Sequence, residues 1–299
     1  MNNIVVLRPD RHQSSGQTIL KNNQCLSGRY ELENILGIGG MSVVYKATDN
    51  MLHTFGAPQH YSAIKLVSES MRDNVQAEKL LFNEYAIASR LKHPNIVAIR
   101  HFDVCREREQ AYLVMDWIEG LLLEELMYRQ AIEPEFALVL ARQLIRAVHH
   151  CHQNQVVHGD IKLSNMIVSP SNHLTLIDFG ISSHSTEPIP YLTELRACSH
   201  RYAAPEVIRH EAQTPAADIF SLCCVLFRLF TGDHPFPDTS ESAEARGWLI
   251  PILFSKRHPL DRLLQAGLSW NKQDRGVSSQ DFFDVFEQMR PEDLKRRWF

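Results

Sequence analysis

The chain has 299 residues, 44% of them apolar and 22% charged, so it is long enough to bury one large core or two modest ones. Its formal net charge of -4 and sequence pI near 6.4 provide no basic field, which argues against nucleic-acid binding. The longest apolar run, residues 219–227, is far shorter than the roughly 20 residues that a membrane helix needs. No membrane span is therefore expected.

The cysteines and the N-terminal residues indicate a cytoplasmic location. The six cysteines show no CxxC spacing, and Cys223 and Cys224 lie within an apolar run, which favours packed thiols in a reducing cytoplasm. Only a short apolar patch, residues 4–7, occurs near the start, so no signal peptide is expected. Residues 1–28 are mostly polar and are predicted to form a mobile tail.

From residue 30 the pattern changes to YELENILGIGGMSVVYKAT, in which apolar and polar residues alternate around a glycine cluster. This pattern predicts two strands joined by a turn. Gly37, Gly39 and Gly40 have no Cβ to prevent a close approach, so their backbone amides could meet phosphate oxygens. A glycine-rich turn that binds no ligand is the alternative.

The next elements are a connecting loop, two strands and a helix. Residues 49–61 are predicted to form a long loop before the strand YSAIKLV, in which Lys65 stands among apolar neighbours. A lysine that points to solvent is the alternative for a single strand lysine. Residues 76–91 have helical spacing and contain Glu84, and residues 111–118 form an apolar strand.

A helical part follows from residue 121. Residues 135–152 are predicted to form a long helix with a buried apolar stripe. His149, His150 and His152 lie near its end, but no carboxylate or thiol set accompanies them at ligand spacing. These histidines are therefore interpreted as helix-end residues and not as a metal site.

The sequence HGDIKLSNMIVSPSNHLTLIDFG, residues 158–180, concentrates acidic residues, an amide and a lysine. Residues 166–168 and 174–177 are strand-like and residues 169–172 are turn-forming, so a hairpin is expected to bring Asn165 and Asp178 side by side. Carboxylate and amide oxygens suit a divalent cation that offsets phosphate charge. For Asp160 and Asn165 alone, turn capping is the alternative.

The remaining residues predict a loop, three helices and a basic end. Residues 181–202 are rich in Ser, Thr and Pro and are predicted to form a loop before Ala204-Pro205-Glu206. Helices are expected over 216–230, 259–268 and 279–289. The end, residues 291–299, is basic and is interpreted as solvated.

Together these motifs resemble those of protein kinases. The sequence Gly39-Gly40-Met41-Ser42 is similar to that of bacterial Hanks-type (eukaryotic-like) serine/threonine protein kinases. The similar motifs are the glycine loop, Ala63-Ile64-Lys65, residues 158–165, Asp178-Phe179-Gly180 and Ala204-Pro205-Glu206. The resemblance implies a two-lobed α+β protein with a small β-rich lobe, 29–118, and a large helical lobe, 119–290. ATP and Mg²⁺, with Mn²⁺ as an alternative metal, are expected between the lobes.

The resemblance also assigns roles to residues. Asp160 is expected to act as the base, with Lys162 beside the transferred phosphate and with Asn165 and Asp178 as metal ligands. Asp218 is expected to hold the backbone of the loop, and Arg275 to pair with Glu206. The expected ATP-binding residues are Leu36, Gly37, Gly39, Gly40, Ser42, Val44, Ala63, Lys65, Glu84, Met115, Asp116, Ile118 and Ile167.

Some positions depart from the family pattern. Ser42 replaces the third glycine of the glycine loop, Cys198 replaces a glycine before Ser199, and Gly159 replaces an arginine that many kinases carry before the aspartate. Ser183 stands where another basic residue is often found. A phosphate on the segment 181–202 would therefore lack two cations, and activity is not expected to require that modification.

The implied function is ATP-dependent phosphorylation of serine or threonine hydroxyls on proteins, with autophosphorylation and a signalling role. A regulatory protein partner is a further expectation. The alternatives are a kinase-shaped scaffold without activity and a small-molecule phosphotransferase. The presence of Lys65, Asp160 and Asp178 disfavours the scaffold, and Ala204-Pro205-Glu206 disfavours the small-molecule enzyme.

Overall fold

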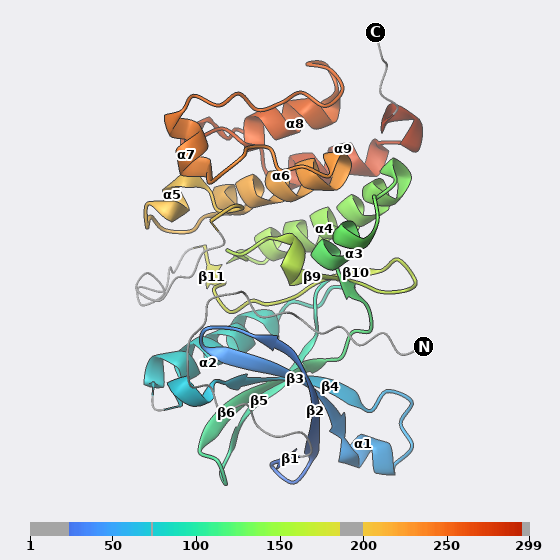
Figure 1. Cartoon of the computed structure of the whole chain (residues 1–299), viewed down its shortest axis with the longest axis vertical. Helices are drawn as coiled ribbons and strands as arrows, with labels where there is room; N and C mark the ends of the chain where they lie inside the picture. Colours follow the sequence, from blue (N-terminus) through green and yellow to red (C-terminus); the bar gives the residue numbers. More distant parts are fainter. Residues whose placement is uncertain (1–23, 73, 186–199, 295–299) are drawn as a thin grey trace. The chain divides into compact units, whose positions relative to one another are not determined.

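A computed structural model describes residues 24–72, 74–185 and 200–294. The described residues form two compact units (Figure 1): unit 1 extends to residue 92 and includes 97–120, and unit 2 comprises 93–96 and the residues from 121 onward. Unit 1 is mainly sheet and unit 2 mainly helical, which confirms the predicted α+β class. No helix in this described part of the chain is long and apolar enough to cross a bilayer.

Unit 1 is built on an antiparallel sheet with the strand order β1-β2-β3-β4-β6-β5. The predicted glycine hairpin and the strand that carries Lys65 are confirmed. The strands are β1 (Gln24–Leu26), β2 (Tyr30–Ile38), β3 (Ser42–Asp49), β4 (Tyr61–Val67), β5 (Ile99–Cys105) and β6 (Gln110–Asp116).

The two faces of this sheet carry different residues. Tyr45, Ile64 and Tyr112 belong to a buried core cluster on one face. Since successive residues of a strand point to opposite faces, Ala63 and Lys65 lie on the other face. Val44 is the cross-strand partner of Lys65 and shares that face. The phosphate-binding candidates of unit 1 are therefore separated from its core cluster.

The structure corrects two predictions in unit 1. Residues 24–28 were assigned to the tail, but β1 pairs with β2 and Leu26 is fully buried; residues 1–23 lie outside the described part. The segment 49–61 was predicted as a loop but contains helix α1 (Asn50–Thr54), because Asp49 accepts hydrogen bonds from the amides of Met51 and Leu52. Helix α2 (Val75–Ala88) begins at the cap Asn74 and ends three residues before the predicted end.

Unit 2 contains the predicted long helices, each within one residue of its expected ends. These are α4 (Pro134–Gln153), α6 (Pro215–Thr231), α8 (Pro259–Gly267) and α9 (Ser279–Gln288). Shorter helical segments are α3 (Leu123–Arg129), α5 (Pro205–Ile208), α7 (Ser240–Ala245), η2 (Leu163–Asn165), η4 (Lys272–Asp274) and η5 (Pro291–Leu294). Helix α6 is buried along most of its length and forms the centre of the unit.

Short strands complete unit 2. The predicted hairpin is confirmed as β9 (Met166–Val168) and β10 (Leu174–Leu176), and β7 (Leu121–Leu122) adds a third strand where helix was expected. Strand β11 (Ser183–His184) pairs with β8 (Val156–Val157), so part of the predicted loop 181–202 is a strand. A two-residue strand has no periodicity in sequence and depends on its partner.

A buried ion pair fastens α5 to the end of unit 2. Arg275 donates from Nη1 to Glu206 Oε1 at 2.5 Å and from Nη2 to Oε2 at 2.8 Å, which confirms the expected pairing. The two side chains are 0% and 5% exposed. Arg275 also donates to the carbonyls of Ser269 and Trp270. This bidentate geometry holds the 204–206 triplet against the chain that follows α8.

Replacing Glu206 should therefore reduce stability strongly. Glu206→Ala leaves the Arg275 charge buried without its partner, so the free energy of unfolding should fall by about 3–5 kcal/mol. Urea denaturation followed by circular dichroism measures this loss. Glu292→Ala is the control, because Glu292 and Arg290 are 61% and 76% exposed and 3.8 Å apart, and it should cost less than about 1 kcal/mol. Equal losses in the two variants would contradict the assignment.

Candidate active site

Lys65 lies on β4 beside a glutamate from α2. Its Nζ is 2.6 Å from Glu84 Oε2, and both residues are buried. A strand lysine that points to solvent, the alternative considered for this position, is therefore excluded. Burial of both charges requires pairing, and the pair fixes the ammonium group on the sheet face opposite the core cluster.

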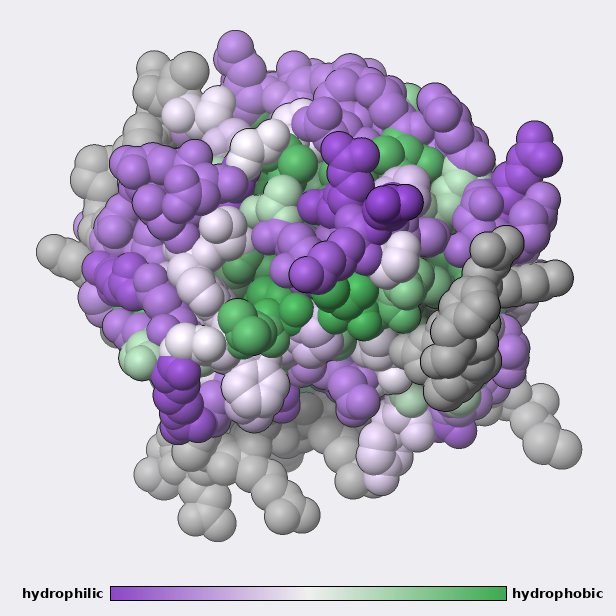
Figure 2. All heavy atoms as spheres, turned by 90° about the horizontal axis from the view of Figure 1, so that it is seen from above, coloured by the Kyte–Doolittle hydropathy of each residue, from purple (hydrophilic) through white to green (hydrophobic). Residues whose placement is uncertain are grey.

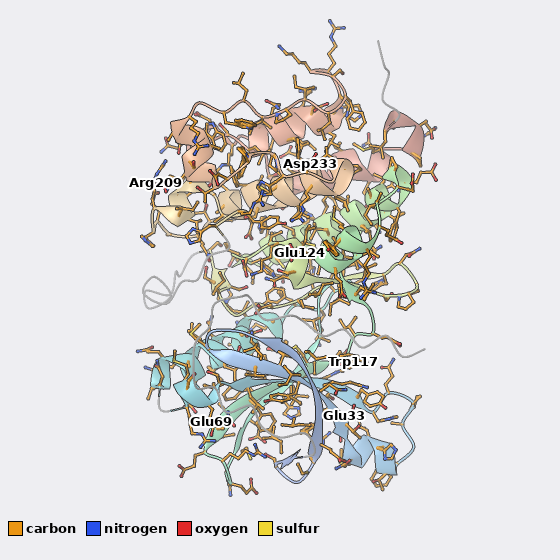
Figure 3. The ribbon with its side chains drawn as sticks, in the orientation of Figure 1. Glu33, Glu69, Trp117, Glu124, Arg209 and Asp233 are labelled. Atoms are coloured by element: carbon orange, nitrogen blue, oxygen red, sulfur yellow. The ribbon has the colours of Figure 1, made fainter. Side chains whose placement is uncertain are left out.

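A second lysine on the same face is held differently. Lys46 is the cross-strand partner of Ala63. Its Nζ lies 3.3 Å from Glu33 Oε2, 3.6 Å from the ring centre of Tyr61 and 5.3 Å from that of Trp117. Glu33 and Trp117 are labelled in Figure 3. These contacts give Lys46 an acidic and aromatic surrounding distinct from the Lys65 site.

The glycine turn joins β2 to β3. The amide of Gly39 donates to the carbonyl of Ser42 at 2.8 Å, which closes the turn around Gly40. A Cβ added at Gly40 would meet nothing within 4 Å, so this position is open. Gly37 pairs with Val44, and the strand register shifts between Ile35 and Gly37, where Leu36 lies. The turn thus presents a bare backbone next to Val44.

The expected adenine-binding residues lie in both units. Ala63 and Met115 are cross-strand partners and are 7% and 8% exposed. Ile167 belongs to unit 2, on β9. The amide of Asp116 already donates to the carbonyl of Ala98 at 3.0 Å, so its carbonyl is the backbone group that a purine could use. Strand β6 ends at this residue, and Ile118 follows outside it.

Residues 158–165 form a loop, called the 158–165 loop, that groups three of the predicted site residues. Lys162 Nζ lies 2.6 Å from Asp160 Oδ2. Asn165 Nδ2 donates to the same oxygen and to the carbonyl of Asp160, each at 2.9 Å. The bond from Asn165 to the carbonyl of Asp160 is a local turn contact, whereas the contacts at Asp160 Oδ2 join the three candidate side chains.

Asn165 and Asp178 come together through the β9–β10 hairpin. The amide of Ile177 donates to the carbonyl of Asn165 at 2.9 Å, so Ile177 lies opposite Asn165 and Asp178 is the next residue in the chain. Asp178 has a positive φ of 65°, an uncommon conformation for a residue other than glycine. Since Asn165 Nδ2 faces Asp160, its amide oxygen is directed elsewhere and suits a hard cation. No group of three His, Cys, Asp or Glu residues suited to a metal occurs among the described residues.

The carboxylate of Asp218 holds the 158–165 loop, as expected. It accepts hydrogen bonds from the amides of His158 and Gly159, both at 2.8 Å, and lies 3.0 Å from His152 Nε2. Asp218 is 1% exposed at the start of α6. Sequence analysis missed His152, which was interpreted only as a helix-end residue, because no local pattern relates it to Asp218, 66 positions later.

His158 is a buried link between the loop and the 178–180 triplet. Its ring centre lies 4.7 Å from that of Phe179, and both residues are fully buried. Its Nδ1 accepts from the amide of Asp160 at 3.2 Å, so the neutral ring carries its proton on Nε2. Burial lowers the pKa of His158. Its carbonyl accepts from Ser182 Oγ at 2.9 Å.

Two hydroxyls at the start of the predicted loop 181–202 are buried. Ser182 is fully buried, and Ser183 is 2% exposed within β11. These hydroxyls are therefore poor sites for modification, whereas Ser185 is exposed. The departure at Cys198 lies outside the described residues, as do Ser199, Thr186 and Thr193.

A separate hollow lies on unit 2. Figure 2 views the α8 side and shows apolar side chains between polar ones. A cavity of about 810 Å³ occurs there between α8, α9 and the segment before α8. None of its lining residues comes from residues 158–180, so it is distinct from the candidate site. Its apolar lining residues are Ile252, Pro259, Leu263, Ala266, Val277 and Val285.

Comparison with known proteins gives one family and several relatives. The family described as the protein kinase domain matches residues 30–298. Serine/threonine-protein kinase PrkC of Bacillus subtilis is 35% identical over 217 residues, which cover 72% of this chain and 32% of the relative. PknB of Mycobacterium tuberculosis is 30% identical over 264 residues, which cover 84% of this chain and 41% of PknB.

PknD of Mycobacterium tuberculosis is 32% identical over 263 residues, which cover 85% of this chain and 38% of PknD. All three relatives carry the words serine/threonine-protein kinase in their names. The aligned segments thus cover between 32% and 41% of the curated relatives.

The lowered pKa of His158 predicts a pH dependence of stability. Because the folded pKa lies below the unfolded value near 6.5, the unfolded chain binds more protons, and stability falls as pH drops below that value. His158→Phe keeps a ring beside Phe179 but cannot take up the proton. Urea denaturation between pH 7.5 and 5 should therefore show a smaller loss of stability in the variant. An identical loss in both proteins would show that the proton binds elsewhere.

Proposed function

The chain belongs to the protein kinase family, and we propose that it transfers the γ-phosphoryl group of ATP to serine or threonine hydroxyls of protein substrates. Family membership implies ATP and a divalent metal; Mg²⁺ is the metal that we propose. The observation that carries the proposal is the grouping of Asp160 with Lys162 and Asn165, with Asp178 directly following the residue that pairs with Asn165.

Asp160 is proposed as the base. Lys162 and Asn165 both contact its Oδ2, which assigns Oδ1 to the proton of the substrate hydroxyl. The contact with Lys162 holds the carboxylate in place. Asn165 limits the rotation of the carboxylate. The hydroxyl oxygen, once held within hydrogen-bond distance of Oδ1, attacks the phosphorus in line with the leaving oxygen.

The cationic and metal-binding groups have complementary proposed roles. Lys65, oriented by Glu84, holds the α- and β-phosphates, and Lys162 offsets charge on the transferred group. Asn165 and Asp178 would hold the divalent cation through oxygen atoms. When bound, that cation offsets the negative charge of the phosphates. The glycine turn, with Ser42 in place of a third glycine, would bind phosphate oxygens through its backbone amides.

The type of substrate hydroxyl, the cellular location and a protein partner are each proposed from a single observation. Lys162 beside Asp160 fits a shallow site in which a short serine or threonine hydroxyl reaches the base. Four of the described cysteines, Cys105, Cys151, Cys223 and Cys224, are free and buried, which supports a reducing cytoplasm. A regulatory protein partner is proposed because Gly159 and Ser183 offer no cation to a phosphate on the 181–202 segment.

The direct test uses labelled ATP, Mg²⁺ and a generic protein substrate, followed by phosphoamino-acid analysis. Wild type should yield phosphoserine or phosphothreonine. Asp160→Asn should lower transfer by at least about 100-fold with nearly unchanged ATP affinity, since it removes only the base. Asp178→Ala should abolish transfer and also weaken Mg²⁺-dependent ATP binding, because it removes a charged ligand.

Lys65→Ala should also abolish transfer, with Lys46→Ala as the matched control. Lys46 shares the sheet face but is held by Glu33 and Tyr61, so its loss should leave most activity. Full activity in Lys65→Ala, Asp160→Asn or Asp178→Ala, or phosphotyrosine as the main product, would refute the proposal. Absence of transfer in wild type despite nucleotide binding would favour the scaffold alternative.

Activity should not depend on a phosphate in the 181–202 segment. The variant Ser185→Ala, Thr186→Ala, Thr193→Ala should keep transfer within about tenfold of wild type, which corresponds to about 1.4 kcal/mol of barrier. Ser182 and Ser183 stay unchanged because they are buried. Wild type treated with a phosphatase is the control and should behave like the variant. A larger loss in both proteins would reveal a phosphate-binding group that this proposal lacks.

A further inference from the structure

Gln213, immediately before the cap of α6, reaches the residue that precedes Asp160. Its side chain is buried, with the residue 4% exposed, and Nε2 donates to the carbonyl of Gly159 at 3.0 Å. Gly159 has a φ of 80°, in the left-handed region that favours glycine. The peptide before Asp160 is thus contacted by a side chain that lies 54 positions away in sequence.

Gly159 and Gln213 fit each other sterically. A Cβ added at Gly159 would lie 2.7 Å from Cδ and 2.8 Å from Nε2 of Gln213, closer than nonbonded carbon atoms allow. Gln213 therefore occupies the space that any side chain at position 159 would enter. Many kinases carry an arginine at position 159. In this chain the space beside Gly159 is filled by the side chain of Gln213.

The orientation of the Gln213 amide has one explanation. A carbonyl oxygen can only accept, so the nitrogen of the Gln213 amide must face the carbonyl oxygen of Gly159. The other amide atom, Oε1, is then buried without a hydrogen-bond partner among the described residues. An apolar side chain of similar size would fill this space without an unpaired acceptor. Glutamine differs from such an apolar side chain in that it donates a hydrogen bond to Gly159.

We propose that Gln213 is a positioning residue for Asp160. It donates to the carbonyl of Gly159, while Asp218 accepts from the amides of His158 and Gly159. Both contacts originate at the start of α6, which is buried in unit 2. The orientation of Asp160 is therefore set by α6 through a neutral amide, without a charged residue at position 159. This inference rests on the proposed function of Asp160 as the base.

The kinetic test compares Gln213→Ala and Gln213→Glu with wild type. Gln213→Ala should lower kcat by about 3- to 30-fold while KM for ATP changes less than about twofold, because one neutral hydrogen bond to the loop is lost. Gln213→Glu is nearly isosteric, but at pH 8 its carboxylate faces a carbonyl oxygen and should be similarly impaired. As pH falls the carboxyl gains a proton and can donate to Gly159 again.

The ratio of Gln213→Glu activity to wild-type activity should therefore rise as pH falls from 8 to 6, whereas the Gln213→Ala ratio should stay flat. Gln265→Glu is the matched control, because Gln265 Nε2 also donates to a backbone carbonyl, that of Ile250 at 3.1 Å, away from this loop. Its ratio should stay near one. A purely structural role would produce no recovery at low pH, and a flat Gln213→Glu ratio would overturn the proposal.

A measurement without activity separates this inference from the proposed function. Hydrogen–deuterium exchange of the peptide covering residues 156–163 should be faster in Gln213→Ala than in wild type, while peptides from unit 1 should be unchanged. Unchanged exchange at 156–163 would overturn the positioning role even if wild type is an active kinase. Faster exchange in a protein without kinase activity would support the contact and refute the proposed function alone.

Discussion

The candidate site residues of unit 2 depend on the hydrogen bonds between the carboxylate of Asp218 and the 158–165 loop. It is buried at the start of the central helix α6 and accepts from two consecutive amides of the 158–165 loop. A buried carboxylate is costly unless its oxygens are satisfied, and these amides, with His152, satisfy them. The loop conformation and the buried carboxylate therefore stabilise each other. Asp160 follows directly in the chain, so its position derives from this contact.

Buried pairs of opposite charge serve the same purpose in the rest of the molecule. Lys65 and Glu84 join a strand to a helix in unit 1, and Glu206 and Arg275 join distant segments in unit 2. Such pairs add little net stability compared with apolar packing, but a single broken partner is costly. They therefore specify one arrangement of backbone around the reacting groups. At Gly159, which has no charged side chain, the neutral hydrogen bond from Gln213 holds the backbone instead.

The errors of sequence prediction have a common origin. Helices α4, α6, α8 and α9 were found almost to the residue, because their apolar period is long and continuous. Strands β1 and β11 were missed because two or three residues carry no period and form only against a partner strand. Helix α1 was hidden in an expected loop, although Asp49 provided a capping signal.

The sequence by itself determined the class of fold, the long helices and the candidate groups at Lys65, Asp160 and Asp178, because motif spacing and periodicity are local properties of the chain. Only the tertiary structure decided which distant residues meet. The approach of Gln213 to Gly159, the contact of His152 with Asp218 and the burial of Ser182 have no sequence signature. Each depends on how separate elements pack, since side chains far apart in sequence contact one another only after the backbone between them has folded.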